Sequence, residues 1–82
     1  MIKPTQQHEA LHMYELEYSY KQAHNGRWTE WFAESQHEHK FEAVQALGRH
    51  VSAHETFSAR VVRYDETSYE PAEVVAEYKF KG

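Results

Sequence analysis

The stretch from residue 12 to residue 35, HMYELEYSYKQAHNGRWTEWFAES, constrains the fold of this chain more than any other. Over 14–21, tyrosine and leucine alternate with charged or polar residues, which is the period-two pattern of a half-buried strand. Asn25-Gly26 follows, and this pair tolerates the positive φ angles of a type I′ turn. Residues 28–35 then return along the first strand. The pattern therefore predicts a β-hairpin with a two-residue turn, whose register decides which side chains share a face.

A single helix is predicted after the hairpin, over 36–48. Ser35 and Glu38 fit a capping box at its start, and Gly48 is the expected end. Apolar residues recur at every third position from Phe41 through Val44 and Leu47, as on one face of an amphipathic helix. We expect this apolar stripe to cover one face of the sheet.

Two further strands are predicted, over 56–64 and 73–81, because both segments are rich in β-branched and aromatic residues. The expected fold class is therefore α+β: a small β-β-α-β-β single domain over 1–82, with a mainly antiparallel four-stranded sheet and one helix packed on one face. Residues 1–11 are expected to form an N-terminal arm or a helical turn. The predicted core consists of Leu16, Tyr18, Trp31, Ala33, Phe41, Val44, Leu47, Val61, Val74, Ala76 and Tyr78.

Two features of the fold stay open at this stage. The strand order is undetermined, because the helix could connect its two flanking strands in either a parallel or an antiparallel arrangement. A helix over 6–22 is an alternative to the first strand, since Leu11, Tyr14 and Tyr18 also lie at helical spacing.

Composition excludes several classes of protein. With 82 residues the chain is long enough for one sheet face and one helix, but leaves little room for a deep catalytic cleft. No apolar run approaches the roughly 18 residues of a membrane span, and the absence of cysteine excludes disulfides and cysteine-ligated zinc. A cytoplasmic location is expected. The formal charge of −4 argues against direct nucleic-acid binding and is compatible with docking onto a basic protein surface.

The predicted hairpin register gives the candidate site. With Asn25 and Gly26 as the only turn residues, the aromatic side of the hairpin meets the helix, and Glu17 faces Glu34 on the outer side. Carboxylates and exposed aromatic rings would then form one patch, where the rings anchor a partner and the carboxylates steer it. A solvated sheet face half-covered by the N-terminal arm is the alternative interpretation. The candidate partner-binding residues are Glu15, Glu17, Trp28, Glu30, Phe32 and Glu34.

Seven histidines suggest a second kind of site. His8 and His12 belong to an H-E-x-x-H pattern, which binds zinc in metalloproteases when it lies on a stable helix with a third ligand. Here it lies in the first dozen residues and runs into a strand. His50 and His54 have ligand spacing only if the helix continues past Gly48. We therefore expect no metal, no other cofactor and no catalytic residues, and keep these four histidines as weak metal candidates.

The leading hypothesis is a small non-enzymatic protein-interaction module or inhibitor that docks an acidic, aromatic sheet face onto a basic partner surface. In one version its carboxylates occupy a nucleic-acid-binding groove on the partner. Small phage-encoded inhibitors, including anti-CRISPR proteins, are similar in size and charge, although no motif in this chain carries the similarity. One alternative is a histidine-based metal- or pH-responsive domain, and another is a small homo-oligomeric enzyme subunit whose strands pair across a two-fold axis.

Overall fold

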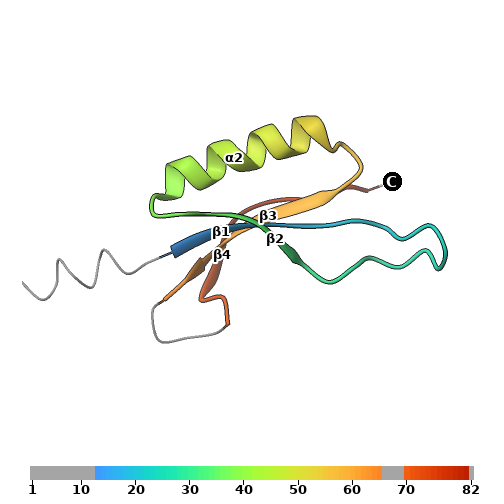
Figure 1. The fold of residues 1–82 in the computed structure, drawn as a ribbon, viewed down its shortest axis with the longest axis horizontal. Coiled ribbons are helices and arrows are strands. Elements are labelled where there is room, and N and C mark those ends of the chain that lie inside the picture. The colour runs from blue at the N-terminus through green and yellow to red at the C-terminus, as the bar shows by residue number, and fades with distance from the viewer. Residues whose placement is uncertain (1–12, 66–69, 82) are drawn as a thin grey trace, which may run out of the picture.

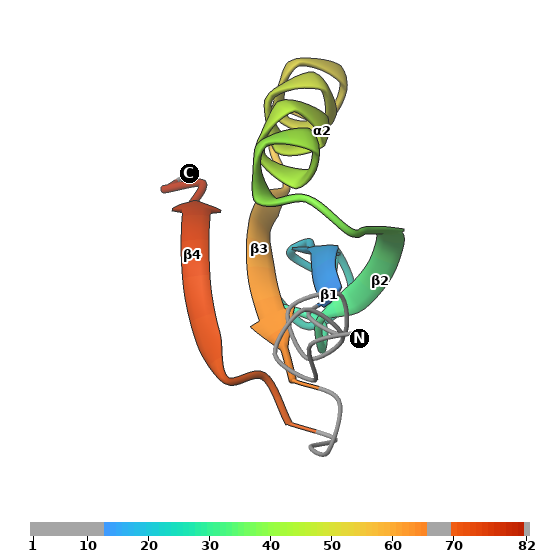
Figure 2. The same ribbon diagram turned by 90° about the vertical axis from the view of Figure 1, so that its left-hand side faces the viewer.

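The structure is a computed structural model that describes residues 13–65 and 70–81. Its elements, in chain order, are strands β1 (Met13–Ser19) and β2 (Phe32–His37), helix α2 (Lys40–Ala53), and strands β3 (Ser58–Tyr64) and β4 (Glu73–Tyr78). The four strands form one antiparallel sheet in the order β2-β1-β3-β4, and α2 lies along one face of it (Figures 1 and 2). The predicted α+β class and the β-β-α-β-β order are confirmed.

The strand order answers the question that the sequence left open. β1 pairs with both β2 and β3 in antiparallel fashion, so β2 and β3 run in the same direction with β1 between them. Helix α2 connects them by crossing over β1, which is why it contacts every strand of the sheet. The alternative helix over 6–22 is wrong for residues 13–19, and its first part lies outside the described residues.

Helix α2 begins and ends later than the sequence predicted. Ser35 belongs to β2, so the capping box is wrong, and the N-cap is His39, which makes no side-chain capping hydrogen bond. The helix also passes through Gly48 and continues to Ala53. A mid-helix glycine costs about 1 kcal/mol relative to alanine. Burial of Leu47 and His50 on either side of it offsets that cost.

The face that α2 buries differs from the predicted stripe. The buried helix residues are Ala43, Ala46, Leu47 and His50, whereas Phe41 is 63% exposed. Alanine lets the helix approach the sheet closely, so Ala43 and Ala46 face inward together with Leu47, while Phe41 faces outward. The core cluster consists of Leu16, Ala43, Ala46, Leu47, Ala59 and Val61, with Tyr14, Tyr18, Val51, Val75 and Ala76 packed against it. Of the other predicted core residues, Ala33, Val44, Val74 and Tyr78 are exposed.

The hairpin turn is longer than the two residues predicted. Gln22 donates its N–H to the carbonyl of Arg27, and Gly26 donates to the carbonyl of Gln22, both at 2.8 Å. Four residues, 23–26, therefore close the turn. Gly26 has a φ of 71°, while Asn25 has a negative φ and instead accepts the Arg27 N–H on its side-chain Oδ1 at 2.9 Å. A type I′ turn needs positive φ at both central residues, so that prediction is wrong.

The returning strand also contains two irregularities. Leu16 faces Ser35 as predicted, but the next pair is Glu17 with Ala33, which leaves Glu34 as an extra residue. Closer to the turn, Lys21 pairs with Trp28, so a further extra residue lies between Trp28 and Phe32. Since neighbouring strand residues point to opposite faces, each extra residue exchanges the faces of the residues beyond it.

Candidate functional site

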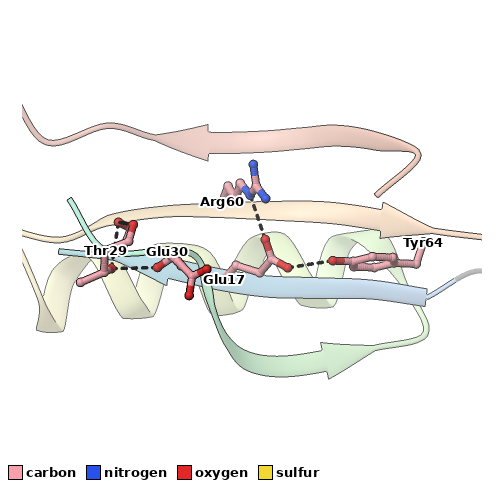
Figure 3. Close-up of polar contacts among 6 residues, drawn as sticks. Glu17, Thr29, Glu30, Arg60 and Tyr64 are labelled. Atoms are coloured by element: carbon pink, nitrogen blue, oxygen red, sulfur yellow. Dashed lines mark hydrogen bonds and ion pairs between the residues drawn. The ribbon is translucent and has the colours of Figure 1, made fainter. Parts of the chain in front are cut away.

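The face of the sheet opposite α2, which we call the open face, carries the candidate site. Its central residues come from β1 and β3, where Glu17 pairs with Arg60 across the two strands. Figure 3 shows these side chains from the open face, with the helix behind the strands. Although no second layer of described residues covers this face, Glu17, Ser19, Ser58 and Val62 are buried. Long side chains of the face itself provide the cover.

Glu17 is the centre of a polar network. Arg60 Nε donates to Glu17 Oε1 at 2.8 Å, and the Tyr64 hydroxyl donates to Glu17 Oε2 at 3.0 Å (Figure 3). The guanidinium of Arg60 also lies 4.3 Å from the ring centroid of Trp31, a cation–π contact. Glu17 is only 5% exposed. Its charge is therefore neutralised within the chain and is not presented to a partner.

Glu15 and Glu17 titrate differently although both belong to the same face of β1. Burial raises the pKa of Glu15, and the neighbouring Glu17 carboxylate raises it further, against an opposing hydrogen bond from Gln36. Burial alone would also raise the pKa of Glu17, but hydrogen bonds from Glu15, Arg60 and Tyr64 lower it below its usual range. Burial and the hydrogen bond to Glu17 raise the pKa of Tyr64 to about 12. Glu17 is thus the carboxylate of the pair that loses its proton first as the pH rises.

An aromatic recess lies on the open face beside this network. Its volume is about 250 Å³. Trp28, Trp31 and Phe80 supply the apolar walls, and the buried Ser19 and Ser58 also line it. The remaining lining residues are Thr29 and Lys79. The hairpin, the start of β3 and the segment after β4 thus meet at this recess.

Hydroxyl groups hold the walls of the recess in place. Ser19 Oγ donates to the Thr29 carbonyl at 2.9 Å, and Thr29 Oγ1 donates to the Glu30 carbonyl at 2.8 Å (Figure 3). On the other side, the backbone N–H of Phe80 donates to Ser58 Oγ at 3.1 Å. These bonds satisfy the two buried serines and fix the segments that carry the rings. Trp28 remains 39% exposed.

The structure separates the six candidate residues of the predicted patch. Glu15, Glu17 and Trp28 belong to the open face, and Glu30 is exposed beside it. Phe32 instead pairs with Tyr18 on the helix side, where their ring centroids are 5.4 Å apart. Glu34 lies at the β2 irregularity and lines a groove near α2. The predicted facing of Glu17 and Glu34 is therefore wrong.

Sequence reasoning missed several residues of the open face. Trp31 was expected in the core under the helix, yet it covers Arg60 and lines the aromatic recess. None of Arg60, Tyr64 and Phe80 was among the candidate partner-binding residues. Alternation along β3 could have placed Arg60 and Tyr64 on one face. For Trp31 the sequence holds no comparable signal, because the inserted residue that exchanges its face follows no sequence rule.

A second group of side chains lies on the helix side, in a groove between α2 and β2 that we call the histidine groove. It is lined by Leu16, Glu34, Ser35, His37, Ala46, Arg49, His50, Ala53 and His54. His50 is 8% exposed, and its Nδ1 has no hydrogen-bond partner among the described residues. Its ring lies 4.6 Å from that of His54 and 5.3 Å from that of Tyr18, measured between centroids. Burial lowers the pKa of His50, and the positive charge of His54 lowers it further, against an opposing effect of Glu34.

Lowering the pH is expected to destabilise the fold through His50. Since its pKa in the folded protein lies below the unfolded value of about 6.5, the unfolded chain binds protons more readily. Stability should therefore fall as the pH drops below that value. Urea unfolding at pH 7.5 and 5.5 would measure this loss, and His50→Phe, which keeps a ring against Tyr18, should reduce it. An unchanged pH dependence in His50→Phe would contradict the assignment.

The histidines do not form a metal centre as they stand. Across residues 13–65 and 70–81, no group of three or more histidine, aspartate or glutamate side chains is placed to hold a metal ion. His50 and His54 do lie close together, because α2 continues past Gly48. His8 and His12 lie outside the described residues. The expected absence of a cofactor stays a prediction.

Comparison with known proteins adds no assignment. The chain matches no protein-family model, no curated protein sequence and no solved structure. Within the described part of the chain, no helix has the length and apolar character needed to cross a membrane. The geometry of the open face must therefore carry the functional interpretation.

Proposed function

We propose that the chain is a small non-enzymatic protein-interaction module that docks the open face of its sheet onto a protein partner with a basic surface, in the cytoplasm. The aromatic recess is the observation that carries this proposal. Tryptophan is enriched among the residues that dominate binding energy at protein interfaces, especially in pockets that exclude water. Both tryptophans of the chain line this one recess.

The size of the recess favours a partner side chain over a small-molecule ligand. Pockets for drug-sized ligands typically measure about 300–1,000 Å³ and bury most of the ligand. The recess, at about 250 Å³, lies below that range. One apolar or aromatic side chain of a partner would suit it, with the rest of the contact spread over the exposed rim.

The charge of the chain supports a basic partner. Glu30 is exposed and lies between the lining residues Thr29 and Trp31 in the sequence. Glu77 is also exposed and lies two residues before the lining residue Lys79. The whole chain has a formal charge of −4. Among the described residues, Lys79 is the only charged side chain that lines the recess. We therefore assign the anchoring to the aromatic rings and the attraction of a basic surface to the rim and the overall charge.

The proposal does not rest on nucleic-acid mimicry of the anti-CRISPR kind. A mimic needs rows of carboxylates free to occupy phosphate positions. Here Glu17 is neutralised by Arg60, and Glu34 lines the histidine groove on the helix side. The carboxylates of the predicted patch therefore do not form one row, and recognition through the recess is the simpler proposal.

Tryptophan fluorescence tests the proposal directly, because both tryptophans report on the recess. A panel of short peptides would carry one central aromatic residue flanked by lysine and arginine, by glutamate, or by glycine and serine. We expect an emission shift with the basic-flanked peptides. Trp28→Ala should weaken their binding at least about thirtyfold, the effect of removing an interface residue worth 2 kcal/mol or more.

The matched control is Phe41→Ala, which removes an exposed ring from the outer side of α2. This variant should bind the peptides as the wild type does. Calorimetry would measure the affinity of every variant. Equal binding by the wild type and Trp28→Ala would overturn the role of the recess. A preference for glutamate-flanked peptides would overturn the basic partner.

A further inference from the structure

The outer side of α2 carries a stripe of residues with the spacing of a helix–helix contact. Phe41, Gln45, Gly48 and Ser52 follow one another at intervals of four, three and four residues, so they lie in a line along the helix. All four are exposed. In Figure 2 this side of α2 points away from the sheet, and no other described element lies against it.

The two ends of this stripe differ in shape. At the N-terminal end Phe41 projects a ring that is 63% exposed, and the neighbouring Val44 is 38% exposed. At the C-terminal end a shallow depression is lined by Gln45, Gly48, Arg49, Ser52 and Ala53. Gly48 has no side chain, and a Cβ added there would meet no heavy atom within 4 Å, so the surface above Gly48 is open space. One half of the stripe is therefore a protrusion and the other a hollow.

We infer that a second copy of this chain packs its α2 antiparallel against the stripe, with Phe41 of each copy seated in the depression over Gly48 and Ser52 of the other. A two-fold axis near the middle of the stripe produces both contacts at once. Such an interface is isologous, because the same patch serves on both copies. It accounts for an exposed phenylalanine on a helix whose opposite face already covers the core.

Charge selects the antiparallel arrangement. Glu42 and Arg49 are seven residues apart, so they lie on the same side of the stripe near its opposite ends. Antiparallel packing brings Glu42 of one copy toward Arg49 of the other, twice per dimer. Parallel packing would instead place this flank of the two copies on opposite sides of the contact, so Glu42 of one copy could not reach Arg49 of the other. Neither residue has an ion pair among the described residues, so both are available for this contact.

The dimer is expected to form and dissociate with concentration. Helix α2 has 14 residues, which corresponds to a length of about 21 Å. A contact along one helix of that length belongs with small, transient interfaces rather than with large obligate ones. The sheet and its open face are not part of the contact, so the dimer would present two aromatic recesses.

Sedimentation velocity over a concentration series tests the inference. The wild type should shift from monomer to dimer as concentration rises. Phe41→Ala should weaken dimerisation more than about thirtyfold, since it removes a buried ring from each copy. Gly48→Leu should also abolish the dimer by filling the hollow. Because leucine favours the helix more than glycine does, this variant should stay folded.

A charge exchange separates this interface from non-specific association. Glu42→Arg or Arg49→Glu alone should weaken dimerisation at least about tenfold through like-charge contacts, and the two together should restore it. A wild type that remains monomeric at millimolar concentration would overturn the inference. So would a dimer that Phe41→Ala and Gly48→Leu leave intact. Peptide binding at the recess is measured independently, so either proposal can fail without the other.

Discussion

Replacing Glu17 with alanine is expected to lower the free energy of unfolding by about 3 kcal/mol, because it removes the acceptor shared by two neighbours on the open face. Arg60 would keep its charge under the Trp31 ring with no carboxylate beside it, and the Tyr64 hydroxyl would lose its acceptor. The side chain of Arg60 is 21% exposed, so water can solvate part of the charge. This places the expected loss at the lower end of the range for breaking buried ion pairs. Urea unfolding at pH 7 measures it.

Glu30→Ala is the matched control for Glu17→Ala. Glu30 lies near the same face, but it is exposed and has no side-chain ion pair among the described residues. Its replacement should change stability by less than about 0.5 kcal/mol. The double variant Glu17→Leu with Arg60→Leu, which removes both charges, should recover part of the loss. Equal effects of Glu17→Ala and Glu30→Ala would show that the network contributes nothing.

Acid unfolding gives the same network a second readout. The pKa of Glu17 in the folded protein lies below its ordinary value of 4.5, so its contribution is present above that pH and is lost as the pH falls through the folded value. Glu15 has the opposite sign: its raised pKa stabilises the fold at low pH, and this contribution fades as the pH rises through the folded value. Glu17→Ala removes the contribution that grows as the pH rises and leaves only a weakened contribution of the opposite sign. Its unfolding free energy should therefore gain less than that of the wild type as the pH rises from 3 to 5.

Local patterns in the sequence were sufficient for the elements of this fold. The alternation from Tyr14 to Tyr18 is a property of one strand, and the structure confirms it. The same holds for the existence of one helix and two later strands. The pairing of β1 with β3 was not predictable, since it joins residues 39 to 51 positions apart in the chain, from Ser19 with Ser58 to Met13 with Tyr64.

The candidate site was predictable only in part, because its register depends on non-local contacts. Trp28 was placed on the correct face, but Trp31 and Phe32 were not. Arg60 stacks on Trp31, and Ser19 bonds to Thr29, in the part of the hairpin that contains the extra residues. Arg60 belongs to β3, about thirty positions after Trp31, so the sequence of the hairpin alone does not indicate this contact. A strictly alternating strand cannot anticipate an inserted residue. The difference between the predicted acidic patch and the observed aromatic recess followed from the two inserted residues of the returning strand.

The helix shows a similar limit. Counting large apolar residues selected the stripe that begins at Phe41, whereas the structure buries Ala43, Ala46 and His50 together with Leu47. Alanine contributes little to a hydrophobic pattern, but its small size decides how closely a helix can approach a sheet. A partly polar ring such as that of His50 is not recognisable as a core residue from sequence alone. The exposed position of Phe41 thus became visible only in the structure.

The largest loss of stability from a single core truncation is expected at Leu16. This side chain is 1% exposed, at the centre of the cluster between α2 and the two central strands. Leu16→Ala should lower the free energy of unfolding by about 3 kcal/mol or more, since it removes buried apolar surface and leaves a cavity. A domain of 82 residues has a total stability of roughly 4–12 kcal/mol. A large part of the free energy of unfolding therefore depends on this one side chain.

Thermal unfolding followed by circular dichroism measures the effect of Leu16→Ala. For a domain of this size, 1 kcal/mol shifts Tm by about 4–8 °C, so a decrease of more than about 10 °C is expected. Val74→Ala is the control, because Val74 is an apolar strand residue that is 46% exposed. Its Tm should fall by no more than a few degrees. If Leu16→Ala and Val74→Ala unfold at similar temperatures, the core does not lie between α2, β1 and β3. In that case the helix is not packed on this face of the sheet, and the opposite face could not be the one free to bind a partner.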